Sequence, residues 1–147
     1  MSEPLQTSLV PADRQHAQLL LEAGYLWMDL GQPEKAREVF VGAAALLPKS
    51  EVPHIALGTL EFSQGRHDKA LQAYRAAQKL APRSGLPRAH AGEALLVLGK
   101  EQEALKELKA AVELEPDGDG ARLARALLEA KSAGVFAGKQ PKKSSSS

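Results

Sequence analysis

A block of 34 residues occurs three times in this chain, and the copies follow one another without insertion. The copies span residues 17–50, 51–84 and 85–118, so the pattern covers most of the 147 residues. A fixed period of this length is typical of repeat architectures, in which neighbouring copies stack and bury one another's apolar faces. The period therefore predicts a stack of small units in place of a single globular core.

Six columns of the aligned copies carry the same or a similar residue each time. They are Gly24, Gly58 and Gly92; Gly31, Gly65 and Gly99; Ala36, Ala70 and Ala104; Phe40, Tyr74 and Leu108; Ala43, Ala77 and Ala111; and Pro48, Pro82 and Pro116. Small residues in the first glycine column and the alanine columns let two antiparallel helices approach closely, and the large fourth column fills the space between them. The second glycine ends one helix and the proline ends the next. Each copy therefore predicts two helices joined by a glycine turn.

The residues after the third copy predict one further helix, because apolar side chains recur at helical spacing between residues 119 and 132. A stack of repeats leaves an apolar face open at its end, and a helix of this kind covers that face. With two helices from each copy, the sequence predicts seven helices in an all-α domain that spans residues 13–133.

Both ends of the chain are predicted to lie outside that domain. Residues 1–12 are expected to be loose because they contain two prolines, while three apolar side chains leave packing or a homodimer open; these are Leu5, Leu9 and Val10. Residues 134–147 are mostly polar, with lysines and a run of serines, and are expected to be disordered.

The composition agrees with a helical protein and excludes some kinds of site. Hydrophobic residues make up 44% of the chain and aromatic residues only 4%, and cysteine is absent. Without cysteine there is no disulfide, zinc–thiolate site or cysteine nucleophile, and a reducing compartment is permitted.

The distribution of charge argues against nucleic acid as a partner. Residues 131–147 carry four lysines and no acid, so residues 1–130 hold 15 basic and 18 acidic side chains, a net charge of −3. Such a body lacks the basic surface that neutralising several phosphates requires. The start of the chain has no basic, apolar leader, and no apolar run approaches the ~20 residues of a membrane span. We expect a cytoplasmic protein without membrane insertion.

The histidines form no recognisable catalytic or metal-binding pattern. His16, His54 and His67 are scattered over the copies, and neither a serine elbow nor a glycine-rich phosphate loop occurs. We therefore expect no catalytic activity, metal or cofactor. An enzyme that uses His90 and Glu93 stays open as an alternative, because residues three apart share one helix face.

The period and the six columns resemble the tetratricopeptide repeat. The resemblance implies a superhelical solenoid whose first helices line a concave groove, with ligand contacts from their second, fifth, sixth, ninth, twelfth and thirteenth places. Carried over to this chain, the groove residues expected to bind a peptide are Leu21, Tyr25, Met28, Ile55, Thr59, Phe62, Ala89, His90, Glu93, Leu96 and Val97. The remaining places fall on Gln18, Glu22, Asp29, Val52, Ala56, Ser63 and Leu86. Because most of these residues are apolar, the resemblance implies a protein or peptide partner with an apolar segment.

The same places argue against one known ligand class of this family. Co-chaperone members that bind the C-terminal carboxylate of a heat-shock protein present lysine, asparagine and arginine at these places. The matching residues here are Leu21, Tyr25, Ala56, Leu86 and His90. A desolvated carboxylate would lack its donors, so we do not expect this ligand class.

A narrower resemblance connects the chain with the translocator chaperones of bacterial type III secretion. The stretch HAGEALLVLG is similar to their third repeat through His90, Ala91, Glu93, Leu95, Leu96 and Gly99. Those chaperones hold hydrophobic export substrates in an apolar groove. Their dimer-forming N-terminal extension is longer than the segment of this chain, so dimerisation by that route is not implied.

Two functional hypotheses follow, besides the enzyme alternative. The first is a binding module whose groove receives an apolar segment of a partner protein, with His90 and Glu93 orienting the segment through hydrogen bonds. The second is a structural subunit that acts in a larger complex through its ends or its convex face.

Overall fold

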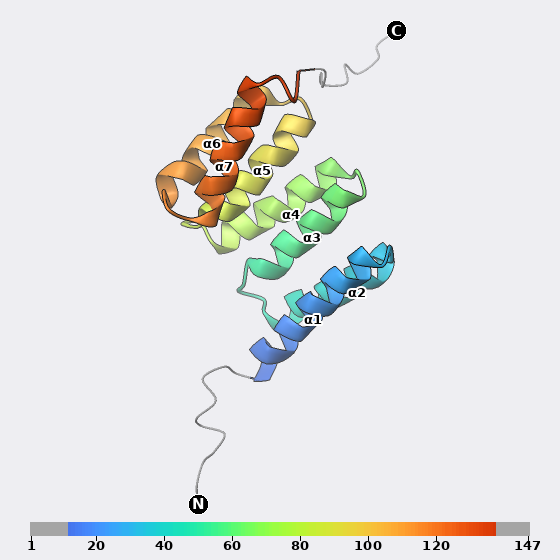
Figure 1. Cartoon of the computed structure of the whole chain (residues 1–147). Helices are drawn as coiled ribbons and strands as arrows, with labels where there is room; N and C mark the ends of the chain where they lie inside the picture. Colours follow the sequence, from blue (N-terminus) through green and yellow to red (C-terminus); the bar gives the residue numbers. More distant parts are fainter. Residues whose placement is uncertain (1–11, 138–147) are drawn as a thin grey trace, which may run out of the picture.

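The computed structural model describes residues 12–137, with side chains from residue 14 onward, and these residues form seven α-helices and no strand (Figure 1). The helices are α1 (Ala12–Asp29), α2 (Pro33–Leu46), α3 (Val52–Ser63), α4 (His67–Leu80), α5 (Gly85–Val97), α6 (Glu101–Leu114) and α7 (Asp119–Ser132). The predicted all-α fold and the number of helices are confirmed for this part of the chain. The loose segment predicted at the start lies outside the described residues, except that Ala12 already belongs to α1.

The helices form three hairpins that stack in chain order, α1 with α2, α3 with α4, and α5 with α6 (Figure 1). The second helix of each hairpin contacts the first helix of the next, and α7 packs on both α5 and α6. Contacts are thus made almost entirely between neighbours, as in a solenoid.

The turn inside each hairpin depends on glycine. Gly31, Gly65 and Gly99 have φ angles of 72°, 76° and 79°, in the left-handed region that strains other residues. Each stands two positions after the last residue of the first helix, and the second helix begins two positions after the glycine. The second glycine column therefore has the role that the sequence predicts.

The first glycine column is explained by close approach. A Cβ atom on Gly24, Gly58 or Gly92 would lie inside the van der Waals distance of the large side chain of the same hairpin; these side chains are Phe40, Tyr74 and Leu108. All three large side chains are fully buried. Each hairpin thus has a small residue on one helix that fits a large residue on the other.

Buried acids connect successive hairpins. Glu61 on α3 pairs with Arg37 on α2. Glu107 on α6 lies 2.7 Å from Arg75 on α4 and 3.3 Å from Arg88 on α5. Gln78 donates a hydrogen bond of 3.1 Å to the same Glu107 carboxylate, so this acid ties three helices together.

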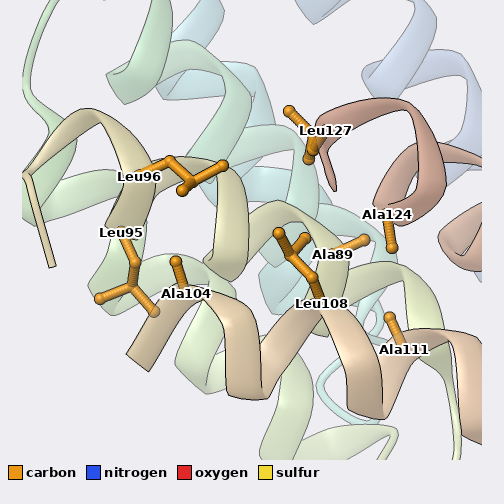
Figure 2. Packing of buried hydrophobic residues seen from close by; sticks show 8 residues of the cluster. All are labelled: Ala89, Leu95, Leu96, Ala104, Leu108, Ala111, Ala124 and Leu127. Atoms are coloured by element: carbon orange, nitrogen blue, oxygen red, sulfur yellow. The ribbon is translucent and has the colours of Figure 1, made fainter. Parts of the chain in front are cut away.

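The last hairpin and α7 share a core that includes more of the C-terminus than the sequence predicts. Ala124 and Leu127 of α7 pack with Leu95 and Leu108 (Figure 2), and Phe136 packs against the same cluster. The tail was predicted to start at residue 134 and to bury nothing. Residues 134–137 instead form turns that bring the Phe136 ring back to the core, and residues 138–147 lie outside the described part.

Candidate functional site

The fifth and twelfth places of each first helix pack against the next unit of the stack. Leu21 and Met28 of α1 pack against a cluster of α2 and α3 residues, and Ile55 and Phe62 of α3 pack against a cluster of α4 and α5 residues. The two places are seven residues apart, which is about two helical turns, so they lie on the same face of the helix. Side chains at these places therefore belong mainly to the junctions between repeats.

Ala89 and Leu96 occupy the same two places on α5. The sequence predicts them as groove residues, but in the structure they belong to the core. Both are buried, in one cluster with Ala124 and Leu127 of α7 (Figure 2). The physical reason is that α7 stands where the next repeat would stand and covers this face of α5. These two residues are not accessible to a peptide.

The other predicted site residues remain partly accessible on the first helices. Tyr25 on α1 is 41% exposed, and the other four are half-buried. These four are Thr59 on α3 and His90, Glu93 and Val97 on α5. Leu21, Met28, Ile55 and Phe62 are half-buried as well, so the accessible part of the predicted groove keeps most of its apolar side chains.

Four side chains from α3, α4 and α5 form a polar cluster. The His90 ring stacks on the Tyr74 ring with centroids 5.0 Å apart and an angle of 18° between the planes. His90 Nδ1 lies 3.8 Å from Glu93 Oε1, too far for a hydrogen bond, and this buried nitrogen has no partner among the described residues. Tyr74 forms a hydrogen bond with Thr59. His90 and Glu93 thus face each other with unused hydrogen-bonding capacity, without the geometry of a catalytic pair.

Tyr74 is a member of this cluster that the sequence analysis placed only in the core. Burial raises the pKa of its phenol to about 12, although the hydrogen bond with Thr59 lowers it and the charge of Glu93 raises it further. The signal was present in the sequence, because the column reads Phe40, Tyr74 and Leu108 and only Tyr74 carries a hydroxyl.

The raised pKa of Tyr74 predicts a loss of stability at high pH. The pKa of the phenol is near its ordinary value of 10.0 in the unfolded chain and near 12 in the folded protein. The stabilisation is therefore complete below pH 10 and is lost as the pH rises toward 12. By about pH 11 the free energy of unfolding should fall by about 1 kcal/mol more in the wild type than in Tyr74→Phe. Urea unfolding at several pH values measures this difference, and parallel pH profiles would contradict it.

A cavity of about 460 Å³ opens between α1, α3 and the connection from α2 to α3. Its apolar lining consists of Leu21, Tyr25, Leu47 and Val52. Its polar lining consists of Arg14, Gln18, Glu22 and Ser50. A second cavity of about 410 Å³ shares Arg14, Leu47 and Ser50 with it and continues along the connection.

The cavity combines predicted and unpredicted residues. Leu21 and Tyr25 were predicted as site residues, and Gln18, Glu22 and Val52 stand at ligand-contact places. Arg14 was missed because it precedes the first repeat. Leu47 and Ser50 were missed because ligand contacts were expected from first helices, and these residues belong to a connection. The sequence feature that could have indicated them is their position shortly before the start of the next first helix.

Ser50 holds the edge of the cavity in place. The backbone N–H of Val52 donates a hydrogen bond of 3.2 Å to the Ser50 hydroxyl at the start of α3. The Tyr25 ring makes an edge-to-face contact with the buried Phe40 ring, with ring centroids 5.1 Å apart. The side chains on both sides of the cavity are thus preorganised.

Other kinds of site find no support in residues 12–137. No three His, Asp or Glu side chains converge there as metal ligands. None of the helices described is both long and apolar enough to span a bilayer. Ala56, at a place where carboxylate-binding family members carry asparagine, is buried.

Three glycine-turned helical hairpins that stack in order and end in a covering helix define a helical-repeat solenoid. Residues 53–84 match the family model of the tetratricopeptide repeat. Residues 53–84 therefore contain one tetratricopeptide repeat, and the seven helices have the helical-repeat fold of that family.

Solved structures with the same fold include a secretion chaperone and a second bacterial protein. The type III secretion translocator chaperone SycD of Yersinia enterocolitica is 22% identical with a TM-score of 0.70, and the match covers 88% of this chain and 98% of that one. PcrH of Pseudomonas aeruginosa is 24% identical with a TM-score of 0.70, over 86% of this chain and 98% of that one.

A third similar structure is a peptide complex. The first repeat domain of Spaghetti (RPAP3), bound to an HSP90 peptide, is 22% identical with a TM-score of 0.69, over 82% of this chain and 94% of that one. The search of curated protein sequences returns no match to the chain.

Proposed function

We propose that this protein is a non-enzymatic binding module that receives an apolar segment of a partner protein on its first helices. The observation that carries the proposal is the cavity between α1 and α3, which combines an apolar lining with polar groups at its edge. Binding sites of this kind take an apolar anchor inside and fix its orientation with a few polar contacts.

The cavity fits the side chain of an anchor residue such as leucine or phenylalanine. Leu21, Leu47 and Val52 supply apolar contact, and the Tyr25 ring supplies a flat surface. Arg14 and Glu22 at the edge supply one charge of each sign, which allows both acidic and basic residues beside the anchor. An anchor that becomes fully buried contributes about 1.5 to 3 kcal/mol.

The polar cluster on α3, α4 and α5 gives the proposal a second contact region. His90 and Glu93 carry hydrogen-bonding groups that no described side chain satisfies at hydrogen-bond distance. The backbone of an extended segment offers donors and acceptors for such groups. Thr59 and Val97 complete this region, on α3 and α5.

The class of partner that we propose is a hydrophobic secretion substrate that must be kept from aggregating in the cytoplasm. The resemblance of the third repeat to type III translocator chaperones supports this choice, and so does the similar fold of SycD and PcrH. The absence of cysteine agrees with a reducing compartment.

Binding of segments to Tyr25 and Val52 variants tests the proposal. Fluorescence anisotropy would use labelled, extended peptides of about ten residues, each with one leucine or phenylalanine anchor among polar residues. Tyr25→Glu and Val52→Glu place a charge at opposite sides of the cavity, so each should weaken binding by about tenfold to a hundredfold.

Leu114→Glu is the matched control, because Leu114 is exposed to a similar extent on α6 and does not line the cavity. It should leave the affinity unchanged. Equal affinity of the wild type and both cavity variants would contradict the proposal, as would the absence of binding by every peptide of the set.

A structural role in a larger complex is the second candidate function. It is favoured by the exposed Leu19 and Leu26 of α1 and by the exposed Leu30 directly after this helix, at the open end of the stack. Such a role predicts assembly contacts that survive Tyr25→Glu and Val52→Glu, which light scattering would detect.

A further inference from the structure

The outer side of α1, together with the residue directly after this helix, carries an exposed apolar row that the proposed peptide binding does not use. Leu19, Leu26 and Leu30 are 62%, 58% and 60% exposed, and the half-buried Ala23 lies between the first two. The four residues, called the α1 seam here, follow steps of four, three and four along the chain. This spacing aligns them on one side of the helix, as in the contact positions of a coiled coil.

The α1 seam corresponds to the face that the first helix of each later repeat buries against the preceding repeat. At the third place of the repeat, the first copy has Leu19, and the later copies have Pro53 and Pro87, which are fully buried. The tenth place is Leu26, and the corresponding Leu60 and Ala94 have no exposed surface. Among the described residues no repeat stands before α1, so the leucines at these two places face solvent. Such a surface is costly to leave uncovered.

The opposite end of the stack is closed. There α7 turns Ala124 and Leu127 inward and exposes Arg122, Arg125 and Glu129. A head-to-tail contact would therefore place the α1 seam against a charged surface, which gives no apolar gain. A contact of the seam with itself meets no such obstacle.

We propose that the α1 seam is the interface of a closed dimer, in which it packs against the α1 seam of a second copy of this chain. A twofold interface uses the same patch on both copies, and a row of leucines with heptad spacing is complementary to itself. Residues 1–11 are a poorer occupant, because Pro4 and Pro11 interrupt any helix long enough to match the row.

The dimer would leave the cavity accessible. Leu21 and Met28 pack against the cluster of α2 and α3 residues, and helical spacing places them on the side of α1 opposite the seam. Tyr25 lines the cavity together with Leu21. Dimerisation and peptide binding therefore use different sides of one helix and can be tested separately.

Light scattering coupled to size-exclusion chromatography tests the dimer over a roughly hundredfold range of protein concentration. The wild type should show twice the 15.7 kDa of one chain, with the dimer populated at the higher concentrations. The double variant Leu19→Glu, Leu26→Glu should run as a monomer, because it places two charges per copy in the interface. Both side chains are already exposed in the single copy, so circular dichroism should show an unchanged helical fold.

The control is Val41→Glu, a similarly exposed apolar residue of the same hairpin that lies on α2. It should dimerise like the wild type. A wild type that is monomeric at every concentration, or a dimer that survives the double variant, would overturn the proposal. So would a wild-type monomer that dimerises only when residues 1–11 are removed, because the N-terminal segment would then be the occupant of the seam. Unchanged peptide affinity in the double variant would keep this result separate from that of the binding proposal.

Discussion

Gly58→Ala should lower the free energy of unfolding by about 3 kcal/mol, although the change adds only one methyl group. The added Cβ would lie inside the van der Waals distance of three ring atoms of Tyr74. That ring cannot move away, because it is 1% exposed and packs with Ala70, Ala91 and Ala94. The helices of the second hairpin must therefore separate, which also loosens the junction with the third.

Gly42→Ala is the matched control and should have the opposite sign. Gly42 lies within α2, and a Cβ there would meet Leu20 at 3.6 Å, an ordinary contact. Alanine costs less entropy than glycine in a helix, so this variant should gain about 0.5 to 1 kcal/mol. Urea unfolding followed by circular dichroism measures both changes. Two variants that shift the midpoint in the same direction would contradict the explanation.

Glu107→Ala should also destabilise the protein by about 3 kcal/mol. The carboxylate accepts hydrogen bonds from Arg75, Gln78 and Arg88, and its side chain is only 11% exposed. Alanine would leave two partly buried guanidinium groups without their shared acid. The loss should be smaller than for a fully buried pair, because the two arginine side chains are 36% and 31% exposed and water screens them.

Glu113→Ala on the same helix serves as the control, because Glu113 is exposed. Its effect should stay within about 0.5 kcal/mol of zero. Urea unfolding curves compare the two variants, and equal midpoints for Glu107→Ala and the wild type would disprove the role of Glu107. The acid at place 107 has no repeat in the other copies, where the same place is occupied by Ala73 and Val39, so only the folded structure reveals its partners.

The candidate site was predictable only in part. The family places correctly indicated which residues lie on the first helices, and Tyr25 proves to line a cavity. They did not separate residues that face open space from residues that face the next repeat. Ala89 and Leu96 illustrate the difference, because their burial depends on α7, which lies more than 20 residues farther along the chain. Tyr25, Thr59, His90, Glu93 and Val97 stay predictions as peptide contacts.

The fold itself was determined by the sequence. The repeated glycines, alanines, prolines and large apolar residues act within one hairpin, over distances of about 30 residues, so their spacing predicts the hairpin and its stacking. Seven helices in the described residues and the left-handed glycine turns confirm this prediction. The turn that returns Phe136 to the core was missed because the polar composition of the tail conceals one aromatic side chain.

What the tertiary structure alone decided is which surfaces stay open. The tenth place of the repeat is leucine on both α1 and α3, yet Leu26 is exposed and Leu60 is buried, because burial depends on whether another repeat stands in front of the helix. The cavity likewise arises between a helix, a connection and the next helix, and none of the three has a recognisable signal alone. A local pattern specifies what a helix can pack against, and only the neighbours present in space determine what remains free to bind.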